Sequence, residues 1–396
     1  MRIAFVTPYL PHPLDAGGKI RSFHLLRGLA RTHDVDLFTV HHGEAPRVPA
    51  ALAEGCASVF SARLESRDGR WRKARQAWRP LMQVIDHFET PEALSEIRGR
   101  LASGRYDLLV ADELCMTPYV AGLPGRKLAA RQKIEHRHYA ALSSRRPPGV
   151  RRWIEALDLR RLRRFERGAM AQVDAAVCCS DEDAGWLRRL NPALPLAVVA
   201  NGVDPEHFEP LPESDGPPAL AYVGTLDYPP NIDALDFFFR AIHPRLTREV
   251  PEVEVRIVGR NPTRDVQDWS RLLGVTVAGP VPDVRPYLAA ARALVVPLRV
   301  GGGTRIKILE CLAAKRPVVS TSIGAEGLGL RHDEHLLVSD EPDAFAHEAA
   351  RLLRDRDLRR RLAEAGRAHV VAHCTWARLG ARFADVCARV ATTGAV

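Results

Sequence analysis

Three consecutive glycines followed by charged residues are the strongest chemical signal in this chain. Gly301, Gly302 and Gly303 follow an apolar run, Ala293–Leu298, and precede a helical pattern over Thr304–Ala314. Glycine lets backbone amides approach a ligand closely, and the first amides of a helix have no partner within it. The helix dipole adds partial positive charge at the same point. This arrangement is typical of an anion site suited to a diphosphate.

Charged side chains beside these glycines extend the chemistry. Arg305 and Lys307 place two cations next to the expected anion site. Glu310 lies about two turns into the helix, where its carboxylate can accept hydrogen bonds from sugar hydroxyls. A tight turn followed by an ordinary amphipathic helix would have the same local pattern. The rest of the chain therefore has to decide between a structural and a ligand-binding interpretation.

Strands and helices are predicted to alternate along the whole chain. These elements must position the glycines and the charged residues that follow them. In the first half we predict strands at Arg2–Thr7, Val35–Val40, Asp107–Ala111, Leu128–Ile134, Asp174–Ser180 and Leu196–Ala200. In the second half we predict strands at Leu220–Val223, Val253–Val258, Val275–Ala278, Ala293–Leu298 and Pro317–Ser320. Residues 205–218 contain five prolines and read as a linker. Alternation on both sides of a linker predicts an α/β protein with two doubly wound domains, 1–204 and 219–375.

A glycine pair opens the first domain. Gly17 and Gly18 lie between the first strand and a helix predicted over Ile20–Arg31, and Lys19 follows them. Strand, glycine loop, helix and strand form a Rossmann-like opening. The pattern G-x-G-x-x-G is absent, so a dinucleotide site has little support. A loop that simply needs two flexible residues is the alternative to a binding role.

Two histidines follow the strand predicted at Leu128–Ile134. They belong to the run Glu135-His136-Arg137-His138. Open α/β sheets bind ligands in the crevice at the carboxyl ends of their strands, so a histidine placed there is a candidate for the active site. We select His136 first and His138 second. The alternative is a solvated surface histidine.

The sequence does not indicate a metal site. No Asp-x-Asp pair stands in a glycine loop, since Asp181-Glu182-Asp183 begins a helix predicted over Asp181–Leu190 and capped near Ser180. The seven cysteines do not have the spacing of metal ligands. We therefore expect neither a metal nor a cofactor.

Length and charge bound the remaining possibilities. With 396 residues and no apolar run near the ~20 that span a bilayer, we expect a two-domain cytoplasmic protein. The net charge of +9 comes from 57 basic residues, of which only six are lysine. No nucleic-acid-binding pattern accompanies this charge. Anionic substrates and an anionic membrane surface remain compatible with it.

Two basic stretches are candidates for contact with a membrane surface. Residues 62–80 contain Trp71 and Trp78, which could share a helix face, and Arg151–Met170 reads as a long arginine-rich helix. The apolar stripe of that helix consists of Trp153, Ile154, Leu157 and Leu162. Such faces can dock on anionic lipid. More often they cover the core or face solvent, which is the interpretation we favour. Peripheral contact with the inner face of a membrane stays open.

The glycine motif resembles the donor-binding signature of the retaining glycosyltransferases of family 4, which have the GT-B architecture. That signature has two glutamates separated by seven residues around a glycine-rich segment, then Leu-Glu-Ala-Met-Ala and a Pro-Val strand. Glu310 matches the second glutamate, which holds the ribose in the family. Gly302 stands in place of the first, which contacts the donor sugar. The departure therefore concerns recognition of the sugar more than recognition of the nucleotide.

The resemblance extends in order over nearly the whole chain. The run from Val173 to Asp204 is similar to the family segment that leads into the hinge between the domains. Family members also carry Gly-Arg and a lysine after the first strand of the donor domain, and both cations bind diphosphate. In this chain Thr225 follows Gly224, and the lysine position falls at Pro230 or Asn231. Both cations are therefore missing.

Three other cations are candidates to replace the missing pair: Arg305, Lys307 and Arg260. Of the first two we favour Arg305, because it is nearer the helix start and its guanidinium suits bidentate phosphate contact.

The resemblance implies two Rossmann-like domains with an interdomain cleft, and a role for each. Domain 1–204 would bind the acceptor, domain 219–375 would bind the donor, and the helix at 376–396 would return to the first domain. The implied donor-binding residues are Gly224, Thr225, Arg260, Gly302, Gly303, Thr304, Arg305, Lys307 and Glu310. The implied acceptor residues are Gly17, Gly18, Lys19 and His138, and the implied catalytic residues are His136, Arg305 and Lys307.

The resemblance further implies a metal-independent, retaining transfer of a hexosyl group from a nucleotide-diphosphate sugar. The acceptor would be a glycan, a lipid-linked glycan or a small molecule, in polysaccharide, glycolipid or natural-product glycoside biosynthesis. Two other classes stay open. One is a nucleotide-sugar epimerase or a phosphorylase of the same architecture. The other is a catalytically silent sugar-nucleotide binding protein.

Overall fold

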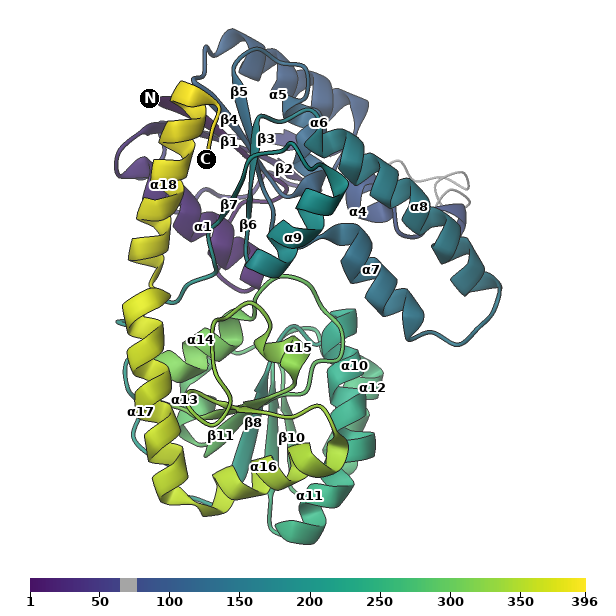
Figure 1. Ribbon diagram of the computed structural model, residues 1–396, viewed down its shortest axis with the longest axis vertical. Helices are drawn as coiled ribbons and strands as arrows, with labels where there is room; N and C mark the ends of the chain where they lie inside the picture. Colours follow the sequence, from purple (N-terminus) through teal and green to yellow (C-terminus); the bar gives the residue numbers. More distant parts are fainter. Residues whose placement is uncertain (65–76) are drawn as a thin grey trace. The chain divides into compact units, whose positions relative to one another are not determined.

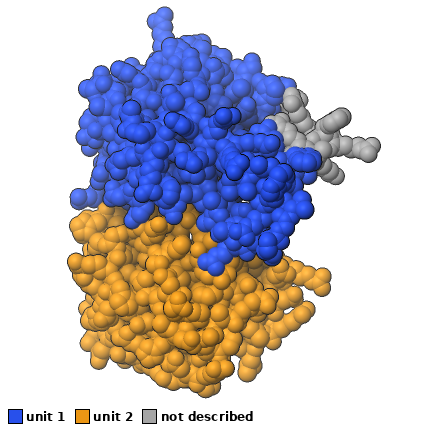
Figure 2. All heavy atoms as spheres, turned by 45° about the vertical axis from the view of Figure 1, so that its right-hand side comes forward, with its two compact units in different colours: residues 1–200, 376–396 blue, residues 201–375 orange. Residues whose placement is uncertain are grey.

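The computed structural model describes residues 1–64 and 77–396 and divides the chain into two compact units. Unit 1 comprises residues 1–200 and 376–396, and unit 2 comprises residues 201–375 (Figure 2). Trp71, one of the two tryptophans considered for a membrane-facing helix, lies outside the described residues. Among the described helices, none is both long enough and apolar enough to cross a bilayer.

A parallel sheet forms the centre of unit 1. The described residues give it seven strands in the order β3-β2-β1-β4-β5-β6-β7. These strands are β1 (Arg2–Thr7), β2 (Asp34–His41), β3 (Ser58–Arg63), β4 (Leu108–Asp112), β5 (Arg126–Ala130), β6 (Ala175–Cys178) and β7 (Leu196–Val198). Parallel strands are covered on both faces, which is why they appear in the sequence as continuous apolar runs. From β1 the chain adds strands first on one side, β2 and β3, and then on the other, β4 to β7, so the strand order reverses between β1 and β4.

Helices cover both faces of this sheet (Figure 1). Their bounds are α1 (Gly17–Ala30), α2 (Ala50–Ala53), α4 (Gln83–Asp86), α5 (Pro91–Ser103), α6 (Thr117–Val120), α7 (Glu135–Ser144), α8 (Val150–Met170), α9 (Asp181–Leu190) and α18 (Trp376–Thr393). The last helix runs beside α1 (Figure 1). A Cβ on Gly28 would lie 2.6 Å from the Cα of Gly380, so the two backbones meet directly. His24 stacks on Trp376, with ring centroids 4.8 Å apart.

Helix α8 turns its carboxylates inward and its arginines outward. Glu155, Asp158 and Glu166 are buried, and Asp158 accepts hydrogen bonds from the amides of Leu81 and Met82. The predicted apolar stripe is only partly correct. Leu162 is fully buried, but Trp153 is 61% exposed. The reason is that carboxylates occupy much of the inward face, where each of them binds a polar partner.

A second parallel sheet forms the centre of unit 2. Within the described residues it has six strands in the order β10-β9-β8-β11-β12-β13. These are β8 (Ala219–Val223), β9 (Glu254–Val258), β10 (Val275–Ala278), β11 (Ala293–Val296), β12 (Val318–Ser320) and β13 (Leu337–Val338). The two parallel sheets confirm the predicted α/β fold class with two Rossmann-like domains.

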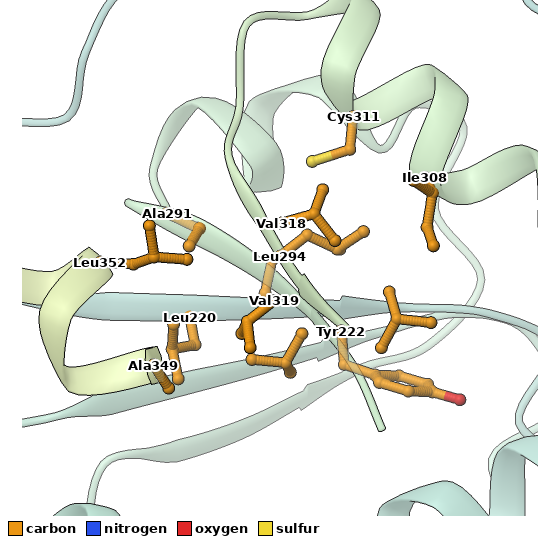
Figure 3. Close-up of a cluster of buried hydrophobic side chains, with 14 of the residues drawn as sticks. Leu220, Tyr222, Ala291, Leu294, Ile308, Cys311, Val318, Val319, Ala349 and Leu352 are labelled. Carbon is orange, nitrogen blue, oxygen red and sulfur yellow. The ribbon is translucent and has the colours of Figure 1, made fainter. Parts of the chain in front are cut away.

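The helices of unit 2 pack on this sheet. They are α10 (Pro229–Phe237), α11 (His243–Glu249), α12 (Arg264–Asp268), α13 (Arg285–Ala289), α14 (Ile306–Ala313), α15 (Ser322–Ala325), α16 (Pro342–Arg354) and α17 (Arg356–His373). Figure 3 shows Ile308 and Cys311 of α14 pointing toward Leu294 and Val318 in the sheet. This packing fixes the rotation of α14 about its axis.

Several local predictions differ from the structure. Helix α1 begins at Gly17, so the glycine pair lies in its first turn and not in a loop. Strand β5 ends at Ala130, four residues before the predicted end. The predicted linker is packed on unit 2, since Phe208 is buried and the amide of Leu211 donates to Ala314. These differences arise because nonlocal partners, which the local pattern does not contain, decide where each element ends.

Candidate functional site

The glycine motif lies at the point where the order of the strands in the sheet of unit 2 reverses, between β8 and β11. Gly224 follows β8 and Gly301 lies in the segment after β11, and these two strands are neighbours in the sheet. In open α/β sheets, ligands bind outside the carboxyl ends of the strands at such a switch point. The structure therefore brings Gly224 and the glycine segment 301–303 to one edge of unit 2.

Lys307 projects from the first turn of α14 toward the end of β8. Its Nζ lies 3.3 Å from Oδ1 of Asn231 and 4.7 Å from the centre of the Tyr222 ring. A Cβ added to Gly224 would lie 2.9 Å from the same Nζ. No carboxylate of the described residues forms an ion pair with Lys307. Burial, together with the charge of Arg305, lowers the pKa of Lys307 to about 7.

Asn231 is held in place to face this lysine. Its Nδ2 donates to the carbonyl of Thr225 at 2.8 Å, and its Oδ1 accepts from the hydroxyl of Tyr222 at 2.9 Å. Pro230 or Asn231 is the position of the missing family lysine, but the sequence pattern alone did not indicate Asn231 or Tyr222 as site residues. The only local signal was the position of Tyr222 near the end of a predicted strand.

Glu310 follows Lys307 by three residues on α14, so the two side chains leave the helix on the same side. Burial raises the pKa of Glu310 to about 7, and the charge of Lys307 opposes this rise. A carboxyl group and an amine therefore lie on the same side of α14 at the switch point without forming an ion pair, and the pKa of each is about 7.

Arg305 holds the glycine segment together. Its Nη1 donates to the carbonyls of Gly302, at 2.9 Å, and Gly303, and its Nη2 donates to Ile323 at 3.3 Å. Gly303 has φ of 69°, a conformation that favours glycine. From its position in the sequence, Arg305 was predicted to contact the phosphates. The structure ties its guanidinium to backbone carbonyls, so Lys307 becomes the stronger candidate for that role.

Thr304 supplies a further polar group. The residue is 8% exposed, and its Oγ1 is buried without a hydrogen-bond partner among the described residues. An unpaired buried hydroxyl is unfavourable, and a ligand or water would satisfy it. Arg260, the remaining candidate cation, follows β9 at the same edge of the sheet, and its carbonyl accepts from the amide of Leu226.

The glycine pair of unit 1 lies at the corresponding switch point, after β1. A Cβ on Gly18 would overlap the hydroxyl of Tyr9 and would lie 3.0 Å from Oε1 of Gln132. Lys19 forms an ion pair with Asp15 at 2.9 Å. Tyr9 and Gln132 were not predicted from the sequence as site residues. Gln132 is the second residue after β5, and correct placement of that strand end would have identified it.

His136 occupies the first turn of α7 and not a strand end, because β5 stops at Ala130 and α7 begins at Glu135. Its Nδ1 lies 2.5 Å from a carboxylate oxygen of Glu166, which is fully buried and also bonded to Arg131. Burial acts to raise the pKa of Glu166, but Arg131 and His136 outweigh it and lower that pKa. The ring of His136 is thus oriented by a buried carboxylate. His138, in contrast, is only 2% exposed.

The substitution His136→Ala is expected to reduce turnover roughly tenfold or more, while nucleotide affinity changes little. His136→Asn is the matched control, because its amide can still donate to Glu166. Turnover is measured as released nucleoside diphosphate. Equal activity of His136→Asn and the wild type would show that the ring serves only to hold Glu166. A loss in His138→Ala but not in His136→Ala would transfer the role to His138.

Among the described residues, no group of three or more His, Cys, Asp or Glu side chains is arranged to hold a metal ion.

Comparison with known proteins places this geometry in a family. Residues 15–207 match the model of the Glycosyltransferase Family 4 domain, and residues 217–355 match that of the Glycosyl transferases group 1 domain. An uncharacterized 44.6 kDa protein in the cps region of Klebsiella pneumoniae is 22% identical over 369 residues, which cover 87% of this chain and 89% of that protein.

Two further proteins of stated activity are similar to this chain. A GDP-mannose-dependent alpha-(1-6)-phosphatidylinositol monomannoside mannosyltransferase of Mycobacterium tuberculosis is 29% identical over 218 residues, which cover 49% of this chain and 56% of that enzyme. The structure of sucrose-phosphate synthase from Thermosynechococcus elongatus superimposes with a TM-score of 0.76 at 18% identity, covering 98% of this chain and 99% of that one.

The two family models together span both Rossmann-like units, and the fold is that of GT-B enzymes. The chain therefore belongs to the group 1 glycosyltransferases of family 4.

Proposed function

We propose that this glycosyltransferase moves a hexosyl group from a nucleotide-diphosphate sugar to an acceptor hydroxyl, with retention of configuration. Unit 2 binds the donor and unit 1 binds the acceptor. One observation carries the proposal. Lys307 lies next to Gly224 at the switch point of unit 2 without a carboxylate partner among the described residues. A partly buried cation in that position is suited to a diphosphate.

Each residue of this edge has a role in the proposal. The backbone amides of the glycine segment and Lys307 bind the diphosphate and stabilise the negative charge that develops as it leaves. Glu310 accepts hydrogen bonds from the ribose hydroxyls. The acceptor attacks from the face that the diphosphate leaves, and the leaving phosphate takes the acceptor proton, so no side-chain base is required. Arg305 keeps the glycine segment in shape.

The class of product is proposed from the relatives. One is encoded in a cps region, and another acts on a phosphatidylinositol mannoside. These support an acceptor that is a glycan or a lipid-linked glycan, in polysaccharide or glycolipid biosynthesis. Because Gly302 replaces the glutamate that contacts the sugar in the family, the identity of the sugar has to be found by experiment.

The test is a panel of UDP, GDP and dTDP sugars incubated with the purified full-length chain. Release of nucleoside diphosphate, by hydrolysis or by transfer to octyl glycosides, would support the proposal. Anomeric configuration of a transfer product, read by NMR, would decide retention. Tight binding of a nucleotide sugar with no turnover would instead identify a catalytically silent binding protein.

Activity is expected to persist in excess EDTA, because amides and Lys307 are proposed to meet the charge of the diphosphate. The measurement is the rate of nucleoside diphosphate release with and without EDTA, with the protein dialysed against chelator as a control for bound metal. Loss of activity that Mg²⁺ or Mn²⁺ restores would overturn this expectation.

We also propose that the outward arginines of α8 contact an anionic membrane surface. The exposed ring of Trp153 beside Arg151 and Arg152 supports this, because aromatic and basic residues together favour the lipid interface. Cosedimentation with vesicles containing phosphatidylglycerol would test it, with vesicles of phosphatidylcholine alone as the control.

A further inference from the structure

Glu113, the first residue after β4, has a backbone conformation that normally requires glycine. Its φ is 79° and its ψ is 155°, whereas the other described non-glycine residues with positive φ have values of 49° to 56°. Side chains other than hydrogen are strongly disfavoured in this region. The amide of Glu113 donates to Ala130 on β5 at 2.9 Å, and its carbonyl accepts from Met116 at 3.2 Å. These two bonds hold the backbone in the strained conformation.

The side chain of Glu113 has no partner among the described residues. The residue is 8% exposed, and no hydrogen bond or ion pair joins its carboxylate to another of these residues. Its oxygens keep contact with solvent, so the carboxylate is open to a ligand. The adjacent Asp112 is fully buried, and one of its oxygens has no partner among the described residues.

Asp112 confirms that this corner is crowded with acidic groups. Its Oδ2 accepts from the hydroxyls of Thr7, at 3.1 Å, and Ser22. Burial and, next, the charge of Glu113 raise the pKa of Asp112 to about 7. The charge of Glu113 thus disfavours ionisation of the adjacent Asp112.

Glycine at position 113 would remove both the backbone strain and the unpaired carboxylate. A strained residue that the surrounding structure holds in place, with an unsatisfied polar group, is characteristic of ligand-binding sites. The position supports such a role. Glu113 follows β4, which neighbours β1 at the point where the strand order of unit 1 reverses. Burial and, next, the charge of Glu113 raise the pKa of Tyr9, which lies against Gly18.

We infer that Glu113 binds the acceptor, and that its carboxylate accepts a hydrogen bond from a hydroxyl of an acceptor sugar. This inference rests on the proposed function, in which unit 1 binds the acceptor. The hydroxyl supplies the partner that the protein does not, and the strained backbone fixes the carboxylate where it can accept this hydrogen bond. Glu113 positions the acceptor and does not need to remove its proton.

Three variants separate the binding role from the strain. Glu113→Gly removes the carboxylate and the strain, and Glu113→Gln removes the charge but keeps the strain. Arg105→Gly is the matched control, because Arg105 is an exposed residue with φ of 49° that precedes β4 at the other end of the strand. We expect Glu113→Gly to raise the melting temperature by roughly 2–4 °C or more.

Transfer is then measured to octyl β-D-glucopyranoside and octyl α-D-mannopyranoside, with the nucleotide sugar that the wild type hydrolyses as donor. Both Glu113 variants should lower kcat/KM for the glycoside about 10- to 100-fold, as expected for a lost hydrogen bond to a charged group. Hydrolysis of the donor without acceptor, and the Kd for nucleoside diphosphate, should stay unchanged. Arg105→Gly should transfer like the wild type.

The outcomes that count against the inference are distinct from those against the proposed function. Wild-type-like transfer by both Glu113 variants would overturn the inference, and so would a Glu113→Gly protein no more stable than the wild type. A wild type that hydrolyses a donor but glycosylates neither glycoside would overturn it as well. A wild type that neither binds nor hydrolyses any nucleotide sugar would instead overturn the proposed function, and the acceptor role with it.

Discussion

Lys307→Met is expected to weaken binding of UDP or GDP by about 10- to 150-fold, the range for a hydrogen bond to a charged group. Methionine keeps the approximate length and the apolar stem of the side chain and removes the charged Nζ that lies over the ring of Tyr222. Affinity for the bare nucleosides uridine and guanosine should be nearly unchanged, because they carry no phosphate. Isothermal titration calorimetry with each diphosphate and its nucleoside measures the two effects separately.

The protonation of Lys307 makes the same interaction depend on pH. In the empty site its pKa is lowered to about 7, so much of the lysine is neutral above that pH. A bound diphosphate favours the charged form and therefore binds together with a proton. We expect affinity for diphosphate to fall as pH rises from 7 to 9 in the wild type. In Lys307→Met this dependence should be absent.

The free energy of unfolding of the protein without ligand should depend on pH in the opposite direction to the affinity for diphosphate. The unfolded chain, where the pKa of lysine is near its ordinary value of 10.5, binds this proton between pH 7 and 10.5, whereas the folded chain does not. Lys307 therefore contributes stability that increases with pH across that window.

If Lys307→Met binds diphosphate like the wild type, the role passes to Arg305, to Arg260 or to Lys19.

Glu310→Gln is expected to weaken binding of nucleosides and nucleoside diphosphates alike, by about 10- to 150-fold. The reason is that Glu310 is proposed to bind the ribose, which both ligands contain. The comparison with Lys307→Met is therefore diagnostic, since only Glu310→Gln should affect uridine. The control is Glu364→Gln on the exposed face of α17, which should bind as the wild type does.

The raised pKa of Glu310 predicts a second pH dependence. Below about pH 7 the carboxyl group is increasingly protonated and loses acceptor capacity, so nucleoside affinity should fall as the pH is lowered from 8 to 6. The fold of Glu310→Gln should survive, because the ionised carboxylate is already unfavourable where it lies. Unchanged nucleoside affinity in a folded Glu310→Gln protein would contradict the ribose assignment.

The local sequence was sufficient to predict those helices and strands whose bounds depend on residues close to them in the chain. The bounds of α9 were predicted correctly, because Ser180 caps the helix through the amide of Asp183 and the first turn is acidic. The two parallel sheets were also predictable, because strands covered on both faces need continuous apolar runs. The glycines, Lys307 and Glu310 were recognised as a candidate site because they belong to a single βα turn.

Tertiary structure decided which charged group is available at that site. Arg305 was favoured on its position in the sequence, but its guanidinium binds carbonyls of its own loop and of Ile323. Lys307 faces Asn231, which is 76 residues away in the chain. A short pattern does not reveal whether a cation already has a partner, because the partner depends on how the loop folds and on which helices pack beside it.

The same reason applies to unit 1. His136 was selected from a strand end that the structure places elsewhere, and its orientation comes from Glu166, 30 residues later. Glu113 attracted no notice in the sequence, because an acidic residue after a strand is ordinary. Its strain exists only because the ladder between β4 and β5 and the turn at Met116 hold its backbone, and both depend on contacts that form when the sheet assembles.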